Sequence, residues 1–242
     1  LSSQVHGYTS GGQGVPTTTQ GRVPFVEKFP FSNESLTTQI GSLSYGRNEG
    51  TGHQSPTHGY TIGGFGGYQL VDKFPLSNDT PISSLSNIPQ NRWRGAAISS
   101  LTDAYVAGGR TDFQFTNITN DIRKFQFSAD GGWADIGDLT QARDQAAGTQ
   151  STTHGYSAGG QFIAPGPSPA TYNTIDKFSF ASNNNATDVG DLIFNLQQGV
   201  GQSSTANGYI SGSQSYGNHI QKFPFSSDAN AQDVGDLSLG RE

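Results

Sequence analysis

The sequence predicts an all-β protein, and three observations support this prediction. Three short motifs recur five times in the same order along the 242 residues. Each motif alternates in character and is bounded by turn-forming residues, which is typical of β-strands. No segment of useful length shows the 3.6-residue apolar period of a helix. The recurrence, at a period of about 50 residues, indicates a repeat architecture.

The first motif is a strand with a central Tyr that ends in Gly-Gly. At the Gly pair we expect the backbone to turn with positive φ or to pass close to a neighbour. The motif occurs as His6–Gly12, His58–Gly64, Asp103–Gly109, His154–Gly160 and Asn207–Ser213.

The second motif is Lys-Phe-x-Phe, in which Phe29 and Phe31 point to one face of a strand while Lys28 and Pro30 point to the other. Pro in three of the five copies removes a backbone donor and suggests a strand near the outer edge of its sheet. The motif occurs as Lys28–Phe31, Lys73–Leu76, Lys124–Phe127, Lys177–Phe180 and Lys222–Phe225.

The third motif is a short strand that ends in Leu, often followed by an Arg and then by a stretch of small residues that forms the first strand of the next unit. Its copies are Ile40–Leu43, Ile82–Leu85, Ile136–Leu139, Val189–Leu192 and Val234–Leu237. The Arg residues are Arg47, Arg92, Arg143 and Arg241.

Four short strands per repeat predict a five-bladed β-propeller of four-stranded antiparallel blades. We expect one domain over residues 1–242, with repeat units at about 1–46, 47–91, 92–142, 143–195 and 196–242. We expect the ring to close with its first inner strand reduced to Leu1–Val5; a piece of a longer array is the alternative. Because the chain lacks Met even at its start, we expect a processed or partial product.

The order of these elements resembles the kelch repeat over the whole chain. It departs from that family in two ways: the Trp expected before the fourth strand survives only as Trp133, and five blades are fewer than kelch propellers usually have. The HGYxxGG…KFPFS…DVGDL form also resembles uncharacterised, often phage-encoded proteins from aquatic sources. The resemblance implies the propeller fold and leaves the activity open.

Composition excludes several classes of function. The net charge is −6, and the 13 Lys and Arg are scattered, so nucleic acid and anionic membranes lack their usual electrostatic attraction. No apolar run is long enough for a membrane span. The chain has no Cys, which excludes disulfides and thiolate chemistry, including the Cys–Tyr cross-link of kelch-type copper oxidases. We expect no cofactor.

The candidate binding residues lie in long insertions between the second and third strands of three units. The insertions span residues 13–27, 110–123 and 161–176, on the face that also holds the connections between blades. Exposed loop aromatics are common in binding faces. The alternative is that the repeat tolerates these insertions without using them. The candidates are Arg22, Phe25, Phe113, Phe115, Phe162 and Tyr172.

Two patterns suggest metal sites, but we expect neither to bind metal. His6, His58 and His154 occupy equivalent positions, which in a propeller lie too far apart to share one ion. The Asp residues of the third motif suggest calcium, yet Asp beside short strands ordinarily caps loop amides. These are Asp135, Asp138, Asp188, Asp191, Asp233 and Asp236.

The catalytic motifs of common enzyme classes are absent: there is no G-x-S-x-G, P-loop or H-E-x-x-H. Residues 128–133 are close to the Asp-box turn of sialidase propellers, which is structural and supports only a turn between the third and fourth strands. The sequence therefore predicts a non-enzymatic binding or structural module outside a cell, on a virion or cell surface. Its partner would be a coat or fibre protein or a surface glycan.

Two other functions remain open from the sequence. A glycan-active hydrolase or lyase at the mouth of the propeller channel could use a pair among the 19 acidic residues. An intracellular protein-interaction propeller is the third interpretation. The small-residue stretches at 96–97, 146–148 and 199–201 are expected to line the channel, and their neutral side chains favour the non-enzymatic module.

Overall fold

The computed structural model of the 242-residue chain describes residues 2–3, 5–14, 21–32, 36–79, 81–113, 116–163, 170–214 and 217–240. The chain divides into two compact units. Unit 1 comprises Leu1–Trp93, Leu101–Ala104 and Phe125–Trp133, and unit 2 comprises Arg94–Ser100, Tyr105–Lys124 and Ala134–Glu242.

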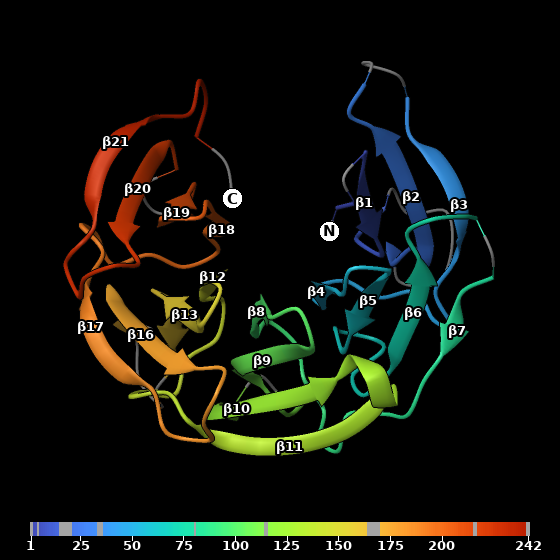
Figure 1. The fold of residues 1–242 in the computed structure, drawn as a ribbon, viewed down its shortest axis with the longest axis horizontal. Coiled ribbons are helices and arrows are strands. Elements are labelled where there is room, and N and C mark those ends of the chain that lie inside the picture. The colour runs from blue at the N-terminus through green and yellow to red at the C-terminus, as the bar shows by residue number, and fades with distance from the viewer. Residues whose placement is uncertain are drawn as a thin grey trace. The chain divides into compact units, whose positions relative to one another are not determined.

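Five antiparallel sheets follow one another along the chain, one per sequence repeat (Figure 1). The first holds β1 (His6–Ser10), β2 (Phe25–Pro30) and β3 (Thr38–Ser42), with an isolated bridge between Ser2 and Gly7. The second holds β4 (Thr51–Gln54), β5 (His58–Ile62), β6 (Val71–Pro75) and β7 (Ser83–Ser84). The third holds β8 (Ala96–Ser99), β9 (Asp103–Arg110), β10 (Ile118–Gln126) and β11 (Gly131–Asp138).

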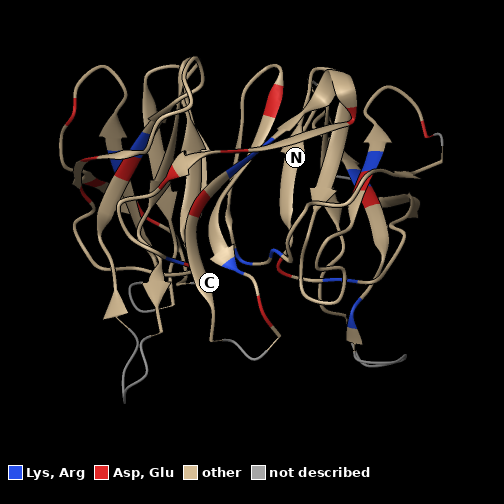
Figure 2. Cartoon of the chain, turned by 90° about the horizontal axis from the view of Figure 1, so that it is seen from below, with Lys and Arg blue, Asp and Glu red and all other residues tan. Residues whose placement is uncertain are grey.

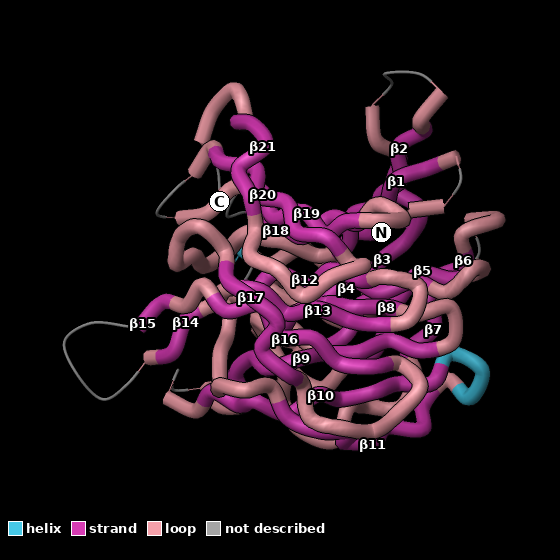
Figure 3. Tube along the Cα trace, turned by 60° about the vertical axis from the view of Figure 1, so that its left-hand side comes forward, coloured by secondary structure: helices cyan, strands magenta, loops and turns pink. Residues whose placement is uncertain are grey.

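The fourth sheet holds β12 (Ala147–Gln150), β13 (His154–Ala158), β16 (Thr174–Ser179) and β17 (Thr187–Asp191). The fifth holds β18 (Val200–Ser203), β19 (Asn207–Ser211), β20 (His219–Pro224) and β21 (Gln232–Asp236). A 3₁₀ turn, η2 (Phe127–Ala129), lies between β10 and β11 and is coloured cyan in Figure 3. The all-β fold of antiparallel propeller blades is confirmed, and each motif forms the strand predicted for it.

The Gly-Gly pair connects each blade to the next through the backbone. Its second residue donates its N–H to the carbonyl oxygen of a framework position, which is occupied by Arg47, Arg92, Arg143 or Leu196. The N···O distances are 2.7–2.8 Å for Gly12, Gly64, Gly109 and Gly160. The first Gly has positive φ, and a Cβ at Gly63 would lie only 2.1 Å from the Arg92 carbonyl oxygen. The Gly pair therefore both adopts positive φ and passes close to a neighbouring backbone, which are the two reasons predicted for it.

Aromatic side chains fill the interfaces between blades. Tyr156 stacks on Phe225 with ring centroids 4.9 Å apart and also contacts Phe223. Tyr60 packs in the same way on Phe125 and Phe127, and burial raises the pKa of its hydroxyl to about 12. Such ring pairs contribute about 0.5–1.5 kcal/mol beyond the area they bury. The alternation predicted for the second motif thus places its Phe residues toward the preceding blade.

Within unit 2 the first strands β8, β12 and β18 pack directly on one another. A Cβ at Gly148 would lie 2.2 Å from the Ala97 carbonyl oxygen, and one at Gly201 would lie 2.1 Å from the Gly148 carbonyl oxygen. The small residues that were expected to line a channel therefore allow close backbone contact between neighbouring blades.

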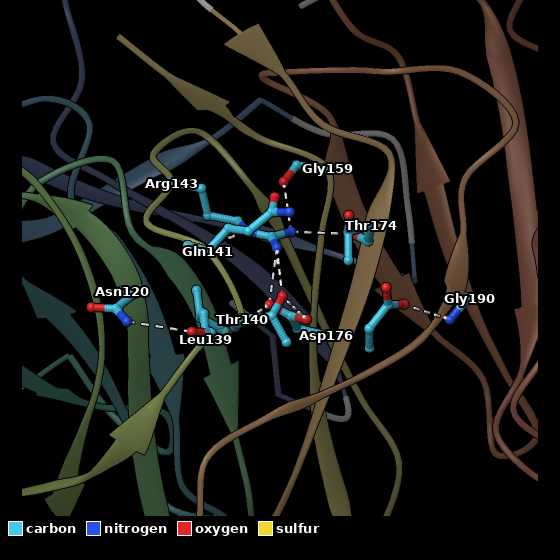
Figure 4. A network of polar contacts seen from close by, with 10 residues as sticks. Asn120, Leu139, Thr140, Gln141, Arg143, Gly159, Thr174, Asp176 and Gly190 are labelled. Carbon is cyan, nitrogen blue, oxygen red and sulfur yellow. Dashed lines mark hydrogen bonds and ion pairs between the residues drawn. The ribbon is translucent and has the colours of Figure 1, made fainter. Parts of the chain in front are cut away.

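A buried Arg–Asp pair ties the framework position to the third strand of its own blade. Arg143 donates to the carbonyl oxygens of Gly159 and Thr174 and contacts Asp176 at 2.9 Å (Figure 4). Asp176 also accepts from the backbone and hydroxyl of Thr140. Both charged side chains are fully buried.

The same pair occurs in the second blade and is replaced as a unit in the fifth. Arg47 and Asp72 lie 2.9 Å apart, each with 1% side-chain exposure. In the fifth blade Leu196 replaces the Arg and Gln221 replaces the Asp, and Gln221 still accepts a backbone hydrogen bond from Ile193. The acceptor role of the third-strand residue is thus kept when the charge pair is lost.

This replacement makes a prediction about stability. Arg143→Leu should lower the free energy of unfolding by about 3–5 kcal/mol, because it leaves the Asp176 carboxylate buried without its counter-charge. Arg143→Leu/Asp176→Gln reproduces the Leu196–Gln221 pair and should recover most of that loss. Urea denaturation measures both variants, and equal destabilisation of the single and double variants would contradict the interpretation.

Candidate functional site

The repeats share the Gly pair and the framework position, but they differ at three positions next to these. The residue after the framework position is Asn48, Trp93, Asp144 or Gln197, and the next one is Glu49, Arg94, Gln145 or Gln198. The residue after the Gly pair is Gln13, Phe65, Arg110, Gln161 or Gln214. We call these the variable positions. They lie where a connection between two blades runs beside a connection between the second and third strands of a blade. The isolated bridges Asn48–Phe65 and Asp144–Gln161 join the two connections.

The backbone at the variable positions is nearly the same in each blade. Glu49, Arg94 and Gln145 all have φ of 58°, and Gln198 has φ of 63°, which is uncommon for residues other than Gly. In unit 2 the Gln145 N–H donates to the Arg94 carbonyl at 2.8 Å, and the Gln198 N–H donates to the Gln145 carbonyl at 3.0 Å. These residues from three successive blades therefore lie side by side.

Unit 2 contains a buried ion pair at these positions that is not part of the repeated framework. Arg110 and Asp144 are 1% and 0% exposed, and Arg110 Nε donates to Asp144 Oδ2. Arg94 Nη1 lies 4.0 Å from the same oxygen. Burial raises the pKa of Asp144 and outweighs the opposing effects of Arg110, Arg94 and Gln161.

Several buried acceptors lie at the variable positions of the fourth and fifth blades. Asp144 Oδ1 and the side-chain carbonyl oxygens of Gln145, Gln197 and Gln198 have no hydrogen-bond donor among the described residues. A buried polar atom without a partner costs free energy, so these positions suit a partner that brings hydrogen-bond donors. We call Arg110, Asp144, Gln145, Gln197 and Gln198 the polar cluster.

The candidates from the sequence fall into both units. In unit 1, the Arg22 guanidinium lies 4.8 Å from the Phe65 ring centroid, and Phe25 is 43% exposed at the start of β2. In unit 2, Phe113 is exposed and Phe162 is half-buried, while Tyr172 stacks on the framework Arg143 at 5.4 Å. Phe115 lies outside the described residues. Tyr172 thus has a framework contact, and the sequence did not reveal it.

Part of the fourth-blade insertion forms a hairpin that the sequence did not predict. Strands β14 (Gln161–Phe162) and β15 (Ala170–Thr171) pair there and stand apart from the β13–β16 sheet (Figure 3). The hairpin begins at variable position Gln161, directly beside Asp144. Phe162 therefore directly follows Gln161, the residue that pairs with Asp144 of the polar cluster, which the loop length alone did not indicate.

The residues considered for metal binding have local structural roles. The Nδ1 atoms of His58 and His154 lie 2.9 Å from the hydroxyls of Thr57 and Thr153. Asp188 accepts a hydrogen bond from the Gly190 N–H at 3.1 Å, which is the predicted capping of a loop amide. The part of the chain that the structure describes contains no group of three or more potential metal ligands among His, Asp and Glu.

The Asp-box-like segment forms the predicted turn between β10 and β11. Asp130 follows η2 with φ of 47°, and its carboxylate pairs with Lys73 of the preceding blade at 2.7 Å. Lys and Arg are interspersed with Asp and Glu over the strands (Figure 2). In the described residues no helix has the length and hydropathy needed to cross a membrane.

Comparison with known proteins identifies the fold but no family. No family model matches the chain, and neither does any curated protein. Among solved structures 190 chains match. One is the structure of YjhT, which matches with a TM-score of 0.75 and 12% identity over 91% of this chain and 79% of that one. At this identity the likeness shows the fold alone, and the class of protein is a β-propeller.

The buried carboxyl makes a prediction about pH. Asp144 should take up its proton above the ordinary Asp value of about 3.9. The stability that protonation of Asp144 gives to the folded state is therefore fully present below the unfolded-state pKa. It is lost as the pH rises through the folded-state pKa. Carboxyl ¹³C NMR, with Asp144→Asn to assign the resonance, measures the midpoint. A midpoint at or below the ordinary value would contradict the assigned effect of burial.

Proposed function

We propose that this protein is a non-enzymatic binding module built on kelch-like repeats, and that the polar cluster of unit 2 holds its partner. The observation that supports this is the contrast between the framework and the variable positions. Glu49, Arg94 and Gln145 share the same φ although their side chains differ, so the fold does not require a particular side chain there. Variable side chains on a fixed backbone are typical of binding surfaces.

The chemistry of the polar cluster favours a hydroxyl-rich partner. The side-chain oxygens of half-buried Gln145, Gln197 and Gln198 lack donors among the described residues and can accept hydrogen bonds from hydroxyl groups, and Arg94 adds positive charge nearby. Exposed Phe113 and half-buried Phe162 from the adjacent insertions can supply apolar contact. A surface glycan meets these requirements, and a glycan-bearing coat or fibre protein would present the same groups.

The setting we propose is extracellular, on a virion or a cell surface. The absence of Cys, the low charge content of 13% and the abundance of Gly support it. The form of the repeats, which resembles phage-encoded proteins, favours the same setting.

One observation favours a second candidate, a glycan-active hydrolase or lyase. Burial raises the pKa of Asp144, and a raised pKa is what a carboxyl needs to act as a general acid. Such an enzyme also needs a second carboxylate within reach of the substrate. Because Asp144 is 0% exposed and paired with Arg110, binding is the better-supported function.

A glycan array tests the proposal. The protein should bind a defined set of glycans saturably, and Gln145→Ala/Gln198→Ala should weaken that binding at least about tenfold, as loss of central contacts does. Thr152→Ala/Thr153→Ala is the matched control, because both residues are exposed on the β12–β13 hairpin of the same unit. The control should bind like the unchanged protein.

Two outcomes would overturn the proposal. One is the absence of saturable binding to any glycan, and the other is equal binding by the unchanged protein and the Gln145→Ala/Gln198→Ala variant. Release of reducing ends from a bound glycan, abolished in Asp144→Asn, would replace the binding module with the enzyme.

A further inference from the structure

A cavity of about 210 Å³ lies in unit 1, separate from the residues of the polar cluster. Its walls come from the ends of β1 and β5, from β4 and from the connection before it. Most of the lining side chains are polar, and several carry hydroxyl groups. The lining residues are Tyr8, Ser10, Gly12, Arg47, Asn48, Glu49, Gly50, Thr51, Gly52 and Thr61.

The repeat supplies a comparison for this cavity inside unit 2. Ser10, Thr61 and Arg47 line the interface between the first and second blades. At the fourth-to-fifth interface the equivalent residues are Ala158, Ile210 and Leu196, which belong to one apolar core cluster. An apolar interface is thus compatible with this fold, and the polar lining of the cavity is not a requirement of the repeat.

The polar groups of the cavity are only partly satisfied. The hydroxyls of Ser10 and Thr61 lie 2.7 Å apart, and the Thr51 hydroxyl donates to the Ile62 carbonyl oxygen. Arg47 is 1% exposed, and its Nε and Nη1 atoms have no acceptor among the described residues. Asn48 Oδ1 likewise has no donor there. The residues that line the cavity therefore include both donors and acceptors without hydrogen-bond partners among the described residues.

Size and charge restrict the ligand. Pockets for drug-sized molecules are about 300–1,000 Å³, so this cavity suits a smaller molecule. The Arg47 charge is already matched by Asp72 at 2.9 Å, and Glu49 adds a negative charge to the lining, so a free anion is disfavoured. Hydroxyl groups can donate and accept hydrogen bonds at once, as these walls require.

We propose that the cavity binds a small neutral polyhydroxylated molecule, of monosaccharide size or smaller. Its hydroxyls would accept from Arg47, donate to Asn48 Oδ1 and exchange hydrogen bonds with Ser10 and Thr61. This site is independent of the polar cluster, which would hold a larger partner on the other unit.

The test uses glycerol, xylitol and glucose as probes, with ligand-observed NMR and thermal unfolding as readouts. At least one probe should bind saturably and raise the melting temperature. Ser10→Ala/Thr61→Ile converts the lining to the residues of the fourth-to-fifth interface and should weaken this binding at least about tenfold, because the added side chain fills the cavity and removes its hydroxyls. Its melting temperature without probe should be unchanged or higher.

Gln145→Ala/Gln198→Ala is the control that separates this site from the polar cluster, and it should bind the probes like the unchanged protein. Failure of all three probes to bind saturably would overturn the proposal, as would equal binding by Ser10→Ala/Thr61→Ile. Probe binding that is lost only in Gln145→Ala/Gln198→Ala would assign it to the polar cluster. If Ser10→Ala/Thr61→Ile unfolds, Thr61→Val, which removes one hydroxyl at nearly constant volume, takes its place with the same expected loss of binding.

Discussion

The hydrogen bond from the second Gly of each pair to the framework carbonyl of the next blade is the contact on which the rest of the structure depends. It uses only backbone atoms, so it is independent of the side chain at the framework position, and Gly160 makes it to Leu196 just as Gly109 makes it to Arg143. It holds because the first Gly of the pair approaches the same carbonyl too closely for a Cβ. The spacing between successive blades is therefore set by backbone contacts and does not depend on side-chain packing.

Side chains then stabilise the blades in two ways that differ in their tolerance of change. The Tyr–Phe interfaces bury apolar area and recur with little variation. The buried Arg–Asp pair is replaced in the fifth blade by Leu and Gln, and the Gly160 N–H to Leu196 carbonyl and Ile193 N–H to Gln221 hydrogen bonds are kept. A buried charge pair adds little net stability over well-packed apolar residues, since desolvation offsets its attraction. The repeat can accordingly exchange the pair without changing the fold.

The sequence was sufficient to predict the strands, the Gly-Gly turns and the order of blades, because these follow from local periodicity and backbone sterics. It did not reveal the Arg110–Asp144 pair, since the two residues lie 34 positions apart in different repeats. A signal was present, however: Asp144 and Arg110 are charged at positions where other units carry Asn48 or Gln161. The loop aromatics were chosen from length and composition alone, and these do not distinguish a residue such as Tyr172, which packs on Arg143, from one that faces a partner.

The polar cluster and the cavity of unit 1 have a common physical origin. Each arises where polar side chains occupy positions whose equivalents in other blades are apolar or form no ion pair. Because the backbone contacts hold the blades in place, such substitutions do not have to contribute to folding. These polar side chains carry a desolvation cost. Apolar side chains avoid that cost in the same fold, as Ala158, Ile210 and Leu196 do at the fourth-to-fifth interface. A bound molecule that satisfies the buried donors and acceptors would offset this cost, which makes the departures from the repeat the places where function is to be sought.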